Sequence, residues 1–103
     1  MQESDRIEFK SELSSALARE VIGFLNAEGG TVYVGVADDG TPLGVTDADE
    51  AALRVTNMVR DAILPDAISF VRVTLVNPDA CATLFGTRPT LGPVVAVEVQ
   101  HGG

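Results

Sequence analysis

The residues that could do chemistry are few, and most lie near the start of the chain. Arg6 and Lys10 alternate with apolar residues, so they share one face of an expected strand, where two cations could bind phosphate. Cys81 is the only cysteine and His101 the only histidine. The sequence therefore excludes an intrachain disulfide, a cysteine-based zinc site and a Ser–His or Cys–His nucleophile pair.

The charge balance is strongly acidic, and the excess lies in one half. The 103 residues contain 15 Asp and Glu against 7 Lys and Arg, a net charge of −8. Residues 1–50 hold 11 acids and 3 bases, whereas the remainder holds 4 of each. Such a chain has no global attraction for phosphate backbones. Nucleic-acid binding would need a local basic face, a metal ion or another part of a larger protein.

Apolar periodicity predicts the elements that must position these residues. Val32, Val34 and Val36 alternate as in a strand, and Leu17, Val21 and Phe24 recur at helical spacing. The expected strands cover residues 6–10, 31–37, 42–45, 66–76 and 93–100. The expected helices end at Gly29-Gly30 and run from about 46 to 64, the second with a stripe of Leu53, Val55, Met58, Val59, Ala62 and Ile63. Residues 77–92 are expected to form a broad hairpin loop.

This order predicts the α+β class, as β-α-β-(β)-α-β-β with a mixed sheet covered by two helices. We expect a single domain over residues 1–103, cut from the N-terminal part of a longer protein, because the chain stops directly after a strand. It contains neither a long apolar run nor a signal peptide, so we expect a cytoplasmic domain without membrane contact.

Four spaced motifs resemble one known family. They are Glu-Ser-x-x-x-Glu-Phe-Lys, Asn-x-x-Gly-Gly, Gly-Val-x-Asp-Asp-Gly and a following glycine, in that order along residues 3–44. The chain is similar to the Schlafen/AlbA-type DNA-binding domain, found in bacterial transcriptional regulators and RecG-helicase-related proteins. That resemblance implies an Alba-like fold. The structural residues of the motifs are Asn26, Gly29, Gly30, Gly35, Gly40 and Gly44.

The resemblance also implies a second activity. In related nucleases three carboxylates form the site, and the matching positions here are Glu3, Glu8 and Asp38. Carboxylates bind Mg²⁺ or Mn²⁺, which can activate water against a phosphodiester. Ordinary roles remain open for each, since Asp38-Asp39-Gly40 is also typical of a hairpin turn and Glu8 could pair with its cationic neighbours.

The leading hypothesis is a regulatory module that binds nucleic acid, with DNA favoured over RNA. Its expected contacts are Arg6 and Lys10, joined by Arg72 if the later strand lies nearby. The first alternative is a metal-dependent nuclease using the three carboxylates. The second is a non-catalytic assembly domain that forms a homodimer or docks on its own downstream modules.

Overall fold

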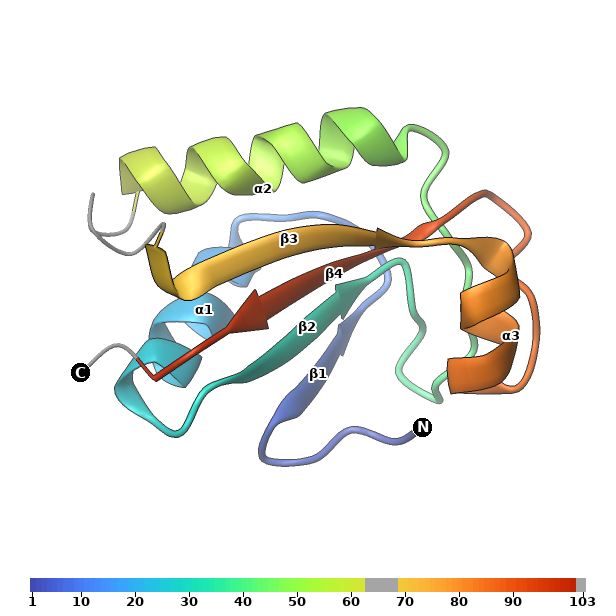
Figure 1. The fold of residues 1–103 in the computed structure, drawn as a ribbon, viewed down its shortest axis with the longest axis horizontal. Coiled ribbons are helices and arrows are strands. Elements are labelled where there is room, and N and C mark those ends of the chain that lie inside the picture. Colours follow the sequence, from blue (N-terminus) through green and yellow to red (C-terminus); the bar gives the residue numbers. More distant parts are fainter. Residues whose placement is uncertain (63–68, 102–103) are drawn as a thin grey trace.

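In a computed structural model the chain folds into a four-stranded sheet with helices on both faces (Figure 1). The structure describes residues 1–62 and 69–101. The elements in chain order are β1 Ile7–Lys10, α1 Ala16–Asn26, β2 Gly30–Val34, α2 Ala48–Ala62, β3 Val71–Val76, α3 Pro78–Phe85 and β4 Val94–Val99. The predicted α+β class is confirmed. Ile63, expected on the second helix, lies outside the described residues, as does the expected start of β3 before Ser69.

The sheet is mixed, with the strand order β1-β2-β4-β3. β1 and β2 are parallel, as the helical connection α1 requires, and β4 runs antiparallel to both β2 and β3. β1 and β3 are therefore the two edges, separated by two strands. The short return strand expected after β2 is reduced to one bridge between Val36 and Pro42.

The first face of the sheet carries the main core. α1 and α2 both pack on it, and α1 is seen behind the strands in Figure 1. The buried side chains are Leu17, Val21, Phe24, Val32, Val34, Ala48, Ala51, Val55, Val59, Val95, Val97 and Val99. The stripe of α2 is Ala51, Val55 and Val59 at four-residue spacing, which leaves Leu53 on the opposite side and 60% exposed. The prediction that Leu53 faces the core was wrong.

The second face is covered at one end only. There α3 packs over a smaller cluster of Phe9, Val36, Cys81 and Val94, with Ile7, Tyr33, Val76 and Phe85 around it. Val36 was expected to share a face with Val34. It reaches the other face because Gly35 adopts a positive φ of 99° and turns the chain after β2.

α3 corrects the expectation of a broad hairpin loop over residues 77–92. The Asn77 side chain caps this helix by accepting a hydrogen bond of 2.9 Å from the backbone N–H of Ala80. Pro78 follows in the first turn, where its missing N–H costs nothing. Gly86 ends the helix at a φ of 89°. The proline and glycine that suggested a loop are the start and stop of a helix.

Candidate functional site

The uncovered end of the second face presents a row of polar side chains across three strands. The strand register places Thr31 of β2 opposite Glu98 of β4, and Glu98 opposite Arg72 of β3. One row closer to α3 the same strands carry Tyr33, Ala96 and Thr74. Because alternate residues of a strand share a face, Thr31, Glu98 and Arg72 point away from α1 and α2. We call this region the open end, and the α3-covered region around Phe9, Tyr33 and Phe85 the covered end.

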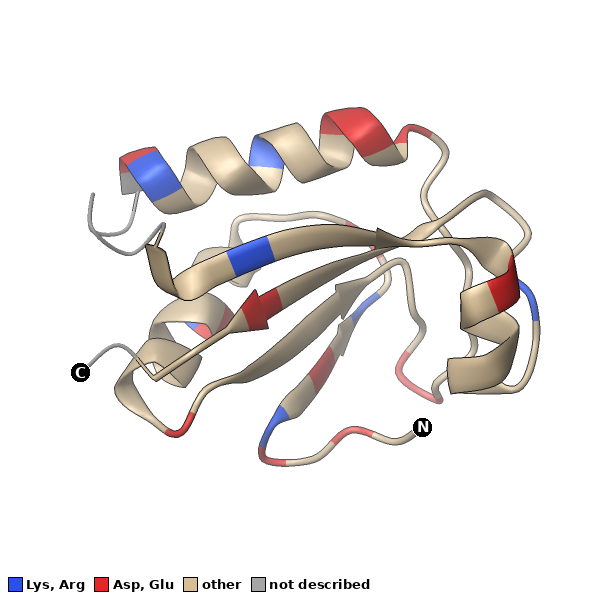
Figure 2. Ribbon diagram, in the orientation of Figure 1, with Lys and Arg blue, Asp and Glu red and all other residues tan. Residues whose placement is uncertain are grey.

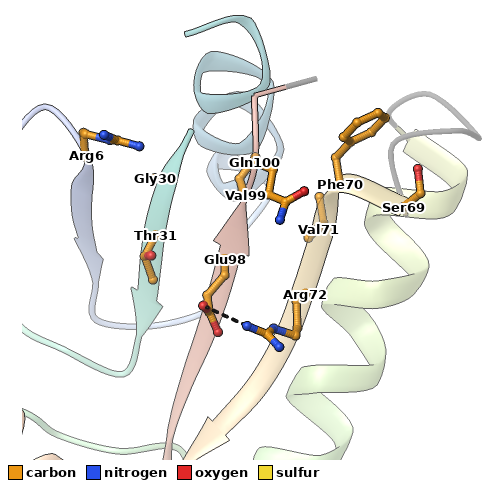
Figure 3. Close-up of a pocket in the computed structure, with 10 residues that line it drawn as sticks. All are labelled: Arg6, Gly30, Thr31, Ser69, Phe70, Val71, Arg72, Glu98, Val99 and Gln100. Carbon is orange, nitrogen blue, oxygen red and sulfur yellow. Dashed lines mark ion pairs between the residues drawn. The ribbon is translucent and has the colours of Figure 1, made fainter. Parts of the chain in front are cut away.

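The open end is hollowed. A depression of about 560 Å³ lies over the row and extends to the start of β1 on one side and to the residues before β3 on the other (Figure 3). Its lining residues are Arg6, Gly30, Thr31, Ser69, Phe70, Val71, Arg72, Glu98, Val99 and Gln100. The backbone N–H of Gln100 donates a hydrogen bond of 2.8 Å to the carbonyl of Phe70, which ties the two chain segments together beyond the row. A volume of this size suits a small organic group.

An ion pair between β4 and β3 lies at one side of the hollow. Arg72 Nη2 lies 3.6 Å from Glu98 Oε2, and the Arg72 side chain is 75% exposed (Figure 3). On the other side, Arg6 Nη2 donates a hydrogen bond of 2.8 Å to the carbonyl of Glu28, which fixes its guanidinium beside β2. Burial, followed by the charge of Glu98, raises the pKa of the Tyr33 hydroxyl in the adjacent row. The described lining thus holds two arginines and one carboxylate.

The N-terminal carboxylates lie elsewhere, on the helix-covered side of β1. The register places Glu8 beside Val32, whose side chain belongs to the main core. A Glu3 carboxylate oxygen accepts a hydrogen bond of 3.0 Å from the backbone N–H of Phe9, which bends residues 3–6 back along the strand. Burial raises the pKa of Glu8, and the nearby charges of Glu20 and Glu3 raise it further. Glu3 and Glu8 therefore lie close to each other.

Asp38 does not complete a metal site with them. It is exposed in the turn after β2, where the N–H of Gly40 donates to the carbonyl of Ala37 and Asp39 Oδ1 accepts from the N–H of Thr41. That bond with Thr41 lowers the pKa of Asp39. Within residues 1–62 and 69–101, no three Asp, Glu, His or Cys side chains are grouped so that they could hold a metal ion. The carboxylates at Glu3, Glu8 and Asp38 do not fit the Mg²⁺ or Mn²⁺ that the resemblance implied.

The three basic residues expected to contact nucleic acid, Arg6, Lys10 and Arg72, do not share one face of the sheet. Lys10 Nζ lies 3.4 Å from Glu20 Oε1 and 3.7 Å from Glu8 Oε1, on the face covered by α1. Arg72 lies on the opposite face and at the other edge of the sheet. Only Arg6 and Arg72 line the same depression. The condition for Arg72 to join Lys10 is not met, because β1 and β3 are opposite edges of the sheet.

Two of the motif glycines lie where another segment of backbone comes so close that a side chain would not fit. Gly44 has a φ of 83°, and a Cβ there would lie 2.1 Å from the carbonyl oxygen of Gly92. Gly29, with a φ of 86°, lies in the turn between α1 and β2, and a Cβ there would lie 2.5 Å from the carbonyl oxygen of Val99. These positions shape the backbone around the sheet and supply no side chain to the hollow.

Several lining residues were not singled out from the sequence. Phe70, within the strand expected over residues 66–76, is partly exposed and lines the hollow. Thr31, Glu98 and Gln100 were not considered. The available signal was the alternation of the last strand, where the charged Glu98 follows Val94 and Ala96 on the face opposite Val95, Val97 and Val99.

Comparison with known proteins identifies the family. The Schlafen, AlbA_2 family model matches residues 3–102, which is nearly the whole chain. The chain belongs to this family. No curated protein and no solved structure matches it. Among the described residues, no helix is long and apolar enough to cross a membrane.

Proposed function

We propose that this domain binds nucleic acid through the open end of the sheet, as a regulatory module of a larger cytoplasmic protein. Membership of the Schlafen, AlbA_2 family supports a nucleic-acid-related function at the level of the family. DNA is the first ligand to test, since the motifs resemble a domain described as DNA-binding. The observation that carries the proposal is the hollow with Arg6 and Arg72 on its two sides.

The charge distribution explains why this surface is favoured over the rest. The acidic residues lie mainly in the N-terminal segment, the turns and the first turn of α2 (Figure 2). With a net charge of −8 the chain repels phosphate at long range. At the hollow, however, two guanidinium groups face one carboxylate, and guanidinium forms paired hydrogen bonds with phosphate oxygens. Binding is therefore local and modest in affinity.

The test is a fluorescence anisotropy titration of labelled DNA and RNA at low salt. Arg72→Ala should weaken binding about three- to tenfold, whereas Arg54→Ala should leave it unchanged. Arg54 is the matched control because it is exposed on α2, which packs on the opposite face. Two phosphate contacts predict a slope near −2 in a plot of log affinity against log salt. The proposal fails if neither nucleic acid binds, or if both variants behave alike.

The geometry does not favour the nuclease alternative, because among the described residues Asp38 is not grouped with the neighbouring Glu3 and Glu8. A cleavage assay with Mn²⁺ tests it, using Glu8→Gln and Asp38→Ala. Loss of cleavage in both variants would show that the two carboxylates act together despite their separate positions. The assembly alternative predicts that the domain has the molecular mass of a homodimer in solution. Size-exclusion chromatography with light scattering would detect this.

A further inference from the structure

The shape of the hollow limits what part of a nucleic acid can enter it. Its floor is the row Thr31, Glu98 and Arg72, which spans two strand spacings, or about 10 Å. To read paired bases, a protein must project a helix or a ribbon into a groove of the duplex. Here Thr31 and Glu98, which are only partly exposed, lie on the floor of a depression instead. A group that reaches them has to project from the nucleic acid, as an unpaired base does.

The chemistry of the floor favours a base over a phosphate. A carboxylate is an acceptor only, so Glu98 repels phosphate but accepts hydrogen bonds from N–H groups. Arg72, held against Glu98 at 3.6 Å, is largely exposed and can reach past the floor, and Arg6 lies on the opposite side of the hollow. A pocket built for phosphate alone would not place an acid between its two arginines. A base with a phosphate on either side matches this order of charges.

An aromatic side chain lines the same hollow. Phe70 lies directly before β3 and is partly exposed, and the hydrogen bond from the Gln100 N–H to its carbonyl fixes its backbone. Stacking on an aromatic ring is a general way to bind an unpaired base, because every base has a π-face. Phe70 thus adds an apolar contact that is independent of the two charges and of base pairing.

From these three observations, and resting on the proposed function, we propose that the hollow accommodates the base of one unpaired nucleotide. Glu98 accepts hydrogen bonds from the N–H groups of the base, and Arg6 and Arg72 contact the flanking phosphates. Cytosine, adenine and guanine present an exocyclic amino group to Glu98. Thymine and uracil offer only the imide N–H, which lies between two carbonyl oxygens that the carboxylate repels, so they bind less well. The ligand is a single strand, and the same chemistry is available from DNA or RNA.

The experiment compares four labelled ligands of about 12 nucleotides: a deoxycytidine strand, a deoxythymidine strand, a cytidine RNA strand and a mixed DNA duplex. A single cytosine strand, of DNA or of RNA, should bind at least about fivefold tighter than both the duplex and the thymidine strand. The DNA and RNA arms then show which backbone the domain prefers.

Variants separate this inference from the proposed function. Glu98→Gln should abolish most of the preference for cytidine over thymidine, and Phe70→Leu should weaken all single strands at least about fivefold. Arg54→Ala is the control for both. If the duplex binds as tightly as the single strands and Arg72→Ala still weakens it, the proposed function stands and the unpaired-base inference is overturned. If Glu98→Gln leaves the base preference unchanged, the assignment of Glu98 is overturned. If no ligand binds, both proposals fail.

Discussion

The two ends of the sheet's second face share a backbone but differ in what their side chains do. At the covered end, the rings of Phe9, Tyr33 and Phe85 meet with centroids 5.2 to 6.3 Å apart, beneath α3. At the open end, the neighbouring row presents Thr31, Glu98 and Arg72, and none of the described helices lies above it. Two residues along each strand thus separate a surface that stabilises the fold from one that can bind a ligand.

Because of this difference, we expect substitutions at the covered end to lower the free energy of unfolding strongly and substitutions at the open end to change it little. Burial of apolar area accounts for most of the stability of a small domain, and exposed ion pairs add little.

The largest effect is expected from Phe9→Ala at the covered end. Phe9 is buried and contacts two aromatic rings, so truncation should lower the free energy of unfolding by about 3–5 kcal/mol. Thr31→Ala at the open end should change it by less than about 0.5 kcal/mol. Urea denaturation of both variants measures the contrast. Similar losses at Phe9 and Thr31 would remove the distinction between the two ends.

A smaller loss is expected from Asn77→Ala, which removes the cap of α3. The Asn77 side chain accepts from the N–H of Ala80, and losing such a cap costs about 1 kcal/mol. Asn77→Asp keeps the acceptor and is the control. Denaturation curves measure the loss, and Tyr33 fluorescence reports whether α3 stays on the aromatic cluster. An unchanged stability in Asn77→Ala would mean that α3 does not depend on this cap.

Arg72→Ala should barely affect stability even though it breaks the ion pair of the open end. The pair is exposed, so its loss should cost less than about 1 kcal/mol. The same variant should bind nucleic acid more weakly, as given above. A thermal melt beside the anisotropy titration distinguishes the two effects. A large loss of stability would show that Arg72 supports the fold and that its effect on binding is indirect.

The smallest effect concerns Glu8, which lies on the first face. Its pKa in the folded chain is raised above 4.5, so the folded state holds its proton to higher pH than the unfolded state does. The stability from this group is therefore greatest at low pH and falls as the pH rises through the interval above 4.5. Glu8→Gln should stabilise the fold at neutral pH by up to about 0.5 kcal/mol.

The Glu8→Gln gain should vanish below the unfolded pKa, at about pH 3.5. Chemical denaturation at the two pH values measures it. Glu12→Gln, at an exposed position of the same segment, is the control. A gain that is equal at both pH values would contradict a raised pKa as its cause.

The sequence predicted those features that depend on local periodicity. The stripe Leu17, Val21 and Phe24 and the alternation of Val95, Val97 and Val99 placed α1 and β4 correctly, because each repeats at the period of its own element. α3 was missed because Pro78 and Gly86 are both helix boundaries and common loop residues. The hollow could not be predicted, since Thr31, Glu98 and Arg72 meet only through the strand order β1-β2-β4-β3. The same order separates Lys10 from Arg72.

The most direct test of the account is a map of the ligand contacts by NMR. Backbone amide signals of the ¹⁵N-labelled domain are followed while a single-stranded cytidine oligonucleotide is added. The account predicts that signals of Thr31, Arg72, Glu98 and Gln100 shift together, with one saturation curve, while those of α2 and α3 stay in place. Shifts concentrated instead at Glu3, Glu8 and Asp38, or on the exposed side of α2, would contradict binding at the open end.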